Sequence, residues 1–134
     1  MFGTLLLAGC GGSDVTEARV EAAVAGTFAN LVHAQLARMG LTEMPVRSLR
    51  VAASCYRAAG ERRGAGEWVC TVVWSGPNGV TLRDTYDLSV GANACYAAAL
   101  GGTAEALGGP IVAGSDGRQV RNLLYAFDGC FDPF

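Results

Sequence analysis

Between Asp14 and Met39, a stripe of mainly apolar side chains recurs every three or four residues, which is the spacing of one face of an α-helix. The stripe consists of Val20, Val24, Phe28, Leu31, Val32, Gln35, Leu36 and Met39. Asp14 or Thr16 is suited to cap the first turn, and Gly40 is suited to the left-handed conformation that ends many helices. The pattern therefore predicts an amphipathic helix over residues 14–39.

After Pro45 the period changes to the strict alternation of β-strands. In the first run one face carries Leu49, Val51, Ala53 and Cys55, and the other carries Ser48, Arg50, Ser54 and Tyr56. In the second run, residues 67–75, one face carries Trp68, Cys70, Val72 and Trp74, and the other carries Val69, Thr71 and Val73. Because the second run is apolar on both faces, we expect it to lie inside a sheet.

A third alternating run covers residues 80–90, and the preceding Pro77-Asn78-Gly79 is typical of a tight hairpin turn. A three-residue loop brings Trp74 opposite Leu82, Cys70 opposite Tyr86, and Trp68 opposite Leu88. Asp84, opposite Val72, is the residue that fits this apolar face poorly. The three runs together predict an antiparallel meander.

The remaining sequence is rich in alanine and glycine. Residues 97–107 predict a short helix interrupted by Gly101-Gly102, and residues 108–114 an ordered loop or a short edge strand. Residues 119–127 have helical spacing but also suit a strand. We expect an α+β fold, with the N-terminal amphipathic helix packed on an antiparallel sheet of three to four strands. Residues 15–134 would form this single domain, which is long enough to bury its own core.

Composition restricts the possible functions. Hydrophobic residues make up 51% of the chain and charged residues 16%, with a net charge of −2. Nucleic-acid binding is not expected, because neutralising phosphates requires clustered cations. All ten basic residues are arginine, a bias typical of a high-GC genome such as that of an actinobacterium. No segment approaches the roughly 20 apolar residues that span a bilayer.

Five cysteines are present: Cys10, Cys55, Cys70, Cys95 and Cys130. A hairpin centred on the loop of residues 58–66 would bring Cys55 opposite Cys70, which leaves Cys95 to pair with Cys130. Two disulfides would indicate an oxidising compartment, whereas five buried free thiols would suit a cytosolic protein. In this pairing scheme Cys10 takes part in neither disulfide.

Leu7-Ala8-Gly9-Cys10 resembles the lipobox of bacterial lipoproteins. The resemblance implies that residues 1–9 are a signal segment removed by cleavage, that Cys10 is lipidated, and that residues 10–14 form a flexible tether. Because secretory signals begin with basic residues and none precedes Arg19, the resemblance also implies a natural start upstream of Met1. The alternative is a short apolar N-terminal strand or coil in which Cys10 is an ordinary thiol.

Catalytic chemistry finds little support in the sequence. A single histidine, His33, and the absence of Cys-x-x-Cys exclude the common zinc sites. Asp84 and Asp87 are an odd number of residues apart on one strand, so they point to opposite faces. Three further carboxylates could gather around calcium, but turn positions are the favoured interpretation for Asp116, Asp128 and Asp132. We expect no catalytic residues, metal or cofactor.

Binding is the favoured class of function. If the tryptophan face of the sheet is buried, the other face presents Arg50, Tyr56, Arg83 and Asp87, residue types that include those favoured in interfaces. Alternatively, the C-terminal segment covers this face. The leading hypothesis is a membrane-anchored, extracytoplasmic lipoprotein that acts as a noncatalytic binding or structural module of the cell envelope. Its partners would be the membrane, through lipid on Cys10, and an envelope protein or small ligand. The alternatives are a secreted inhibitor or ligand carrier that uses the exposed face and, third, a carboxylate-based hydrolase.

Overall fold

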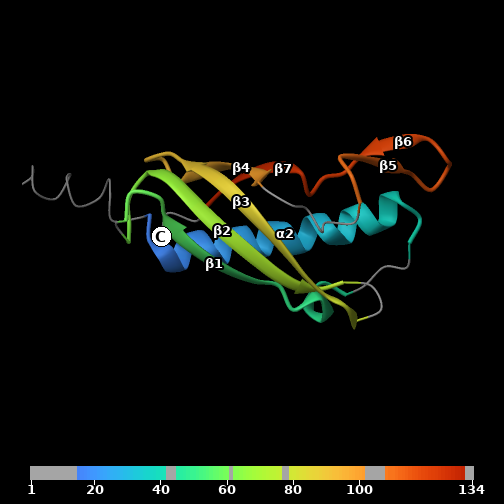
Figure 1. Ribbon diagram of the computed structural model, residues 1–134, viewed down its shortest axis with the longest axis horizontal. Coiled ribbons are helices and arrows are strands. Elements are labelled where there is room, and N and C mark those ends of the chain that lie inside the picture. The colour runs from blue at the N-terminus through green and yellow to red at the C-terminus, as the bar shows by residue number, and fades with distance from the viewer. Residues whose placement is uncertain (1–14, 42–44, 61, 77–78, 102–107, 132–134) are drawn as a thin grey trace, which may run out of the picture.

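The computed structural model describes residues 15–41, 45–60, 62–76, 79–101 and 108–131. One long helix lies against one face of a five-stranded antiparallel sheet, and a separate two-stranded hairpin lies beyond one end of that sheet (Figure 1). In chain order the elements are helix α2 Glu17–Arg38, the 3₁₀-helix η1 Val46–Leu49, and strands β1 Ala52–Arg57, β2 Gly66–Ser75, β3 Thr81–Val90, β4 Cys95–Gly101, β5 Ile111–Ala113, β6 Gln119–Arg121 and β7 Ala126–Cys130. The expected α+β class is confirmed, and the sheet has more strands than the three to four expected.

Helix α2 has the boundaries that its terminal residues favour. Thr16 is extended, and its hydroxyl accepts a hydrogen bond from the Arg19 backbone N–H at 3.2 Å, so the helix begins at Glu17. At the other end Gly40 is left-handed, with φ of 72°. The Gly40 N–H then donates to the Ala37 carbonyl, and the Leu41 N–H donates to the Leu36 carbonyl. Asp14, the alternative cap, lies outside the described residues.

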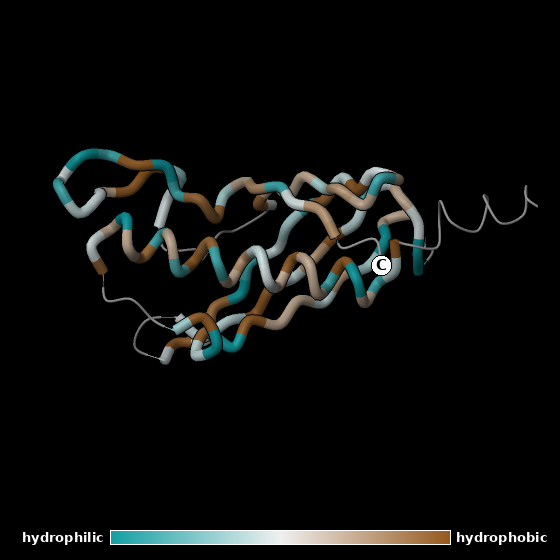
Figure 2. Tube along the Cα trace, turned by 180° about the vertical axis from the view of Figure 1, so that it is seen from behind, coloured by the Kyte–Doolittle hydropathy of each residue, from teal (hydrophilic) through white to brown (hydrophobic). Residues whose placement is uncertain are grey.

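The apolar stripe of α2 faces the sheet, and hydrophilic and hydrophobic residues alternate along the helix (Figure 2). Its fully buried members include Val20, Val24, Phe28, Val32 and Leu36. Gln35 is buried among them, and its side-chain oxygen accepts the Leu123 backbone N–H at 2.9 Å. A polar residue in the stripe therefore links the helix to the segment between β6 and β7.

The first predicted strand begins later than its alternation indicated. Residues 46–49 form η1, in which the Ser48 hydroxyl and N–H both donate to the Pro45 carbonyl, at 2.7 and 2.9 Å. This local bonding competes with strand pairing. Arg50 follows in a left-handed conformation, with φ of 49°, and β1 starts at Ala52. The predicted strand positions of Leu49 and Arg50 are therefore wrong, although Leu49 is still fully buried.

The meander was predicted in the correct register. Trp74 lies opposite Leu82, Cys70 opposite Tyr86, and Trp68 opposite Leu88. Gly79 has the expected positive φ, 74°, while Pro77 and Asn78 lie outside the described residues. The turn sequence and the alternation of apolar residues both favour this register. A shift of one residue would move the tryptophans to the opposite face of the sheet.

Beyond the meander, pairing overrides local propensity. The predicted helix over residues 97–107 is wrong, because residues 95–101 form β4 between β3 and β7. Residues 102–107 lie outside the described part of the chain. Residues 108–114 contain β5, an edge strand, and residues 119–127 divide into β6 and the start of β7. Asn122 causes that division, because its side-chain oxygen accepts the Leu124 N–H at 3.0 Å in a local turn.

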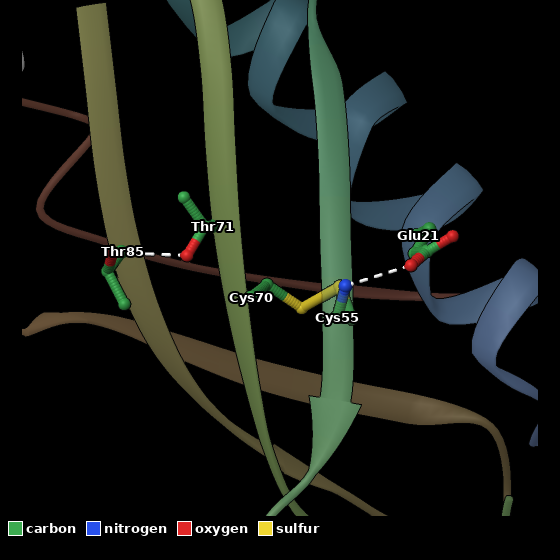
Figure 3. The surroundings of a disulfide bond; sticks show 5 residues. All are labelled: Glu21, Cys55, Cys70, Thr71 and Thr85. Carbon is green, nitrogen blue, oxygen red and sulfur yellow. Dashed lines mark hydrogen bonds between the residues drawn. A yellow bond between two sulfur atoms is a disulfide. The ribbon is translucent and has the colours of Figure 1, made fainter. Parts of the chain in front are cut away.

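Both expected disulfides are present, and they lie on opposite faces of the sheet. Cys55–Cys70 joins β1 to β2 beneath the helix, and Cys95–Cys130 joins β4 to β7 on the far face. The N–H of Cys55 points out from the edge of β1 and donates to Glu21 of α2 at 2.9 Å (Figure 3). Glu21 thereby satisfies a donor that the edge strand would otherwise leave open.

The core is centred on aromatic rings. Phe28 of α2 packs edge-to-face against Trp74 and Tyr86, with ring centroids 5.5 and 6.0 Å apart. The Tyr86 hydroxyl donates to the Leu124 carbonyl at 2.6 Å, and burial, with the nearby charge of Asp84, raises its pKa. The misfit of Asp84 is also explained: its carboxylate is buried and accepts the Trp74 indole N–H at 3.0 Å.

Candidate functional site

The face of the sheet that points away from α2 is the candidate contact surface, and we call it the outer face. Its residues on the first three strands are Ala52, Ser54, Tyr56, Glu67, Val69, Thr71, Val73, Ser75, Thr81, Arg83, Thr85, Asp87 and Ser89. All of them are half-buried or exposed. The last strand, β7, extends the sheet at its edge, so the described C-terminal segment does not cover this face as the alternative proposed.

Three of the four predicted surface residues lie on the outer face. Tyr56, Val69 and Asp87 are directly opposite one another in β1, β2 and β3. Ala52, Val73 and Arg83 form a second row, four residues along each strand. Tyr56 is 59% exposed, a large fraction for an aromatic side chain on a sheet.

Arg50 does not belong to this surface, which corrects the prediction. Its left-handed backbone ends η1 before β1 begins. It lines a separate hollow of about 290 Å³ together with Arg47, and Ala25 and Gly26 of α2 form the opposite wall. The alternation failed here because the pattern from Leu49 onward continues that of a strand, whereas the backbone turns before Ala52.

Between the two rows lies a third that is rich in hydroxyl groups. It consists of Ser54, Thr71, Thr85 and Gly101, each opposite the next across β1 to β4. The hydroxyls of Thr71 and Thr85 are 3.3 Å apart and share a hydrogen bond (Figure 3). Gly101 leaves room for Asp87, since a Cβ at position 101 would lie 2.8 Å from the Asp87 Oδ2.

Small side chains leave a surface hollow of about 330 Å³ beside this row. Its lining residues are Ala52, Ala53, Ser54, Tyr56, Thr71, Val73 and Arg83. The hollow therefore has an aromatic side chain at one end, a cation at the other and short side chains in its floor. Sequence reasoning assigned most of these residues to one face but missed the hollow, because its depth depends on the pairing of β1 with β2.

A second hollow, of about 520 Å³, surrounds the Cys95–Cys130 disulfide. Its other lining residues are Ser89, Asn93, Tyr96, Ala97, Asp128 and Gly129. Cys130 is exposed and Cys95 half-buried, whereas Cys55 and Cys70 are 5% and 0% exposed. The two disulfides therefore differ in their access to solvent.

We expect a mild reductant to open Cys95–Cys130 well before Cys55–Cys70, because an attacking thiolate must reach a sulfur atom. Brief exposure of the native chain to dithiothreitol, followed by alkylation and peptide mass spectrometry, measures the order. The chain unfolded in urea is the control, in which both bonds should open at similar rates. Equal rates in the native chain would contradict the prediction.

The carboxylates do not converge in the described part of the chain. Asp84 is buried on the inner face and Asp87 exposed on the outer face, as their odd separation predicted. Asp116 lies between β5 and β6, Asp128 lies in β7, and Asp132 is outside the described residues. Among the described residues no group of three or more histidine, cysteine, aspartate or glutamate side chains could hold a metal ion.

No protein-family model, curated protein or solved structure matches this chain. The described helices include none that is long and apolar enough to cross a membrane. The two disulfides suggest an oxidising, extracytoplasmic location. The outer face and the N-terminal motif are the features of this chain that bear on its function.

Proposed function

We propose that this chain is an extracytoplasmic lipoprotein that acts as a noncatalytic binding or structural module of the cell envelope. Lipid on Cys10 would anchor it, and the outer face would contact its partner. Two disulfides account for four of the five cysteines, which agrees with a separate role for Cys10. Cys10 and the rest of the lipobox lie outside the described residues.

The open outer face is the observation that carries the binding role. An antiparallel sheet can leave one face in water, but such a face is usually covered with polar side chains. This face is also mostly polar, but it carries an exposed tyrosine, Tyr56, in one row with Val69, and Arg83 lies two rows away beside Val73. Tyrosine and arginine carry much of the binding energy in protein interfaces, so this face suits a protein partner.

The anchor is tested by replacing Cys10. We expect Cys10→Ala to move the protein from the membrane fraction to the soluble fraction of a bacterial host, because stable anchoring requires more than one acyl chain and Cys10 would carry them. Ser13→Ala, three residues away in the tether, is the matched control and should stay in the membrane. Mass spectrometry should find acyl groups on Cys10 and no residues 1–9. Membrane association that is unchanged in Cys10→Ala would refute the anchor.

The hollow beside Tyr56 favours a second candidate function, a secreted inhibitor or ligand carrier. Its volume of about 330 Å³ is at the lower end of small-molecule sites. Native mass spectrometry of protein purified from its host should then show a bound small molecule that Tyr56→Ala loses. Identical spectra for the two proteins would exclude this candidate.

A further inference from the structure

The outer face has a pattern that is complementary to itself. We call Ala52, Val73 and Arg83 the arginine row, and Tyr56, Val69 and Asp87 the aspartate row. The central row of Ser54, Thr71 and Thr85 lies midway between them, two residues from each along every strand. Each outer row is therefore about 7 Å from the central row, at roughly 3.4 Å per residue.

A two-fold axis along the central row would place the arginine row of one copy opposite the aspartate row of a second copy. A rotation about this axis reverses the direction of the strands, so each strand faces the same strand of the second copy in antiparallel orientation. The arginine row of one copy therefore faces the aspartate row of the other. On β1 Ala52 would then face Tyr56, and on β2 Val73 would face Val69. On β3 Arg83 would face Asp87. Two sheets packed in this way meet with their strands about 30° apart, as in β-sandwiches.

The shapes of the facing residues agree with this arrangement. Tyr56 is 59% exposed, so much of its ring is open to contact. The position opposite it after the rotation is Ala52, which lines the hollow of about 330 Å³. An exposed aromatic ring on one copy would thus meet a hollow floored by short side chains on the other. Because the contact is isologous, the same fit occurs twice.

The charges agree as well. Arg83 and Asp87 are both exposed, and the rotation turns them into two oppositely charged pairs across the interface. Residues on the axis face their own copies, so a charge there would meet a like charge. The central row carries hydroxyl groups instead, which both donate and accept hydrogen bonds and can pair with themselves.

From this complementarity we infer that the partner of the outer face is a second copy of the chain, joined face to face about a two-fold axis along the central row. The inference rests on the proposed function only in taking the outer face as the contact surface. In this arrangement the valines of β2 face one another, with Tyr56 of the edge strand β1 on one side of them and the charged pairs of β3 on the other.

The test uses charge reversal in the full chain with Cys10→Ser, which prevents both lipidation and intermolecular bonding through that thiol. Sedimentation equilibrium should show a dimer. Arg83→Asp and Asp87→Arg should each weaken dimerisation at least about tenfold, because each turns two attractive pairs into two repulsive ones. An equimolar mixture of these two variants should recover affinity as a one-to-one heterodimer, which native mass spectrometry distinguishes by mass.

Matched controls reverse charges on the hairpin of β5 and β6, which is not part of the outer face. Arg121→Asp and Asp116→Arg should leave the dimer intact. A chain that stays monomeric at millimolar concentration overturns the inference, as does a dimer that both outer-face reversals leave unchanged. The proposed function fails separately, if Cys10→Ala stays in the membrane, so the two results are distinguishable.

Discussion

Replacing Phe28 with alanine should lower the free energy of unfolding by about 3–5 kcal/mol, the usual range for removing a fully buried aromatic side chain. Phe28 is 0% exposed and contacts the rings of Trp74 and Tyr86 edge-to-face. The change leaves a cavity at the centre of the helix–sheet contact. Domains are stable by only about 5–15 kcal/mol, so this loss would remove between about a fifth and all of the stability.

Urea denaturation followed by tryptophan fluorescence measures this loss, because Trp68 and Trp74 are each only 1% exposed in the folded state. Gly26→Ala on the same helix is the control. Gly26 is exposed, and a Cβ there would meet nothing within 4 Å. This substitution should raise the free energy of unfolding by about 0.5–1 kcal/mol, since alanine loses less entropy in a helix. A loss below about 1 kcal/mol in Phe28→Ala would contradict the packing described, given the usual cost of such a cavity.

Removing the exposed disulfide should have a comparable effect for a different reason. The double variant Cys95→Ala/Cys130→Ala should lose about 4 kcal/mol, the loop-closure entropy for a sequence separation of 35. Both cysteines lie outside the core, so burial contributes little to this loss. The effect arises in the unfolded chain, which becomes more expanded without the bond.

The same urea titration tests this prediction through two quantities. The midpoint should fall, and the dependence of the free energy on urea should become steeper, because the unfolded variant exposes more surface. Cys55→Ala/Cys70→Ala is the comparison, with a separation of 15 and an entropic share of about 3 kcal/mol. A loss below about 1 kcal/mol for the Cys95–Cys130 pair would show that the unfolded chain is not restrained by it.

Most of the fold could be predicted where independent local signals agree. The register of β2 and β3 follows from two local signals. The turn sequence fits one loop length, and the alternation of apolar and polar residues fixes which face of the sheet each side chain occupies. The opposition of Cys55 and Cys70 follows from the hairpin they flank. The outer-face positions of Tyr56, Arg83 and Asp87 follow from the same parity.

Prediction failed where local signals compete with distant ones. Alanine favours helices, yet Ala97 to Ala99 form a strand because β3 and β7 both pair with them. Arg50 fits the alternation that follows it, yet the hydrogen bonds at Pro45 turn the backbone before β1 begins. In both segments the residues allow two conformations, and neighbours elsewhere in the fold select one.

The sequence by itself determined the helix, the meander, the Cys55–Cys70 pair and the parity of the outer face, because period, turn chemistry and cysteine spacing act over short distances. The Cys95–Cys130 pair followed only by elimination. Only the tertiary structure decided the five-strand order, the hollow beside Tyr56 and the partners of the buried polar groups. Gln35 meets a backbone N–H 88 residues away, at Leu123. No local pattern encodes such a contact, since its geometry exists only once the helix and the sheet have packed together.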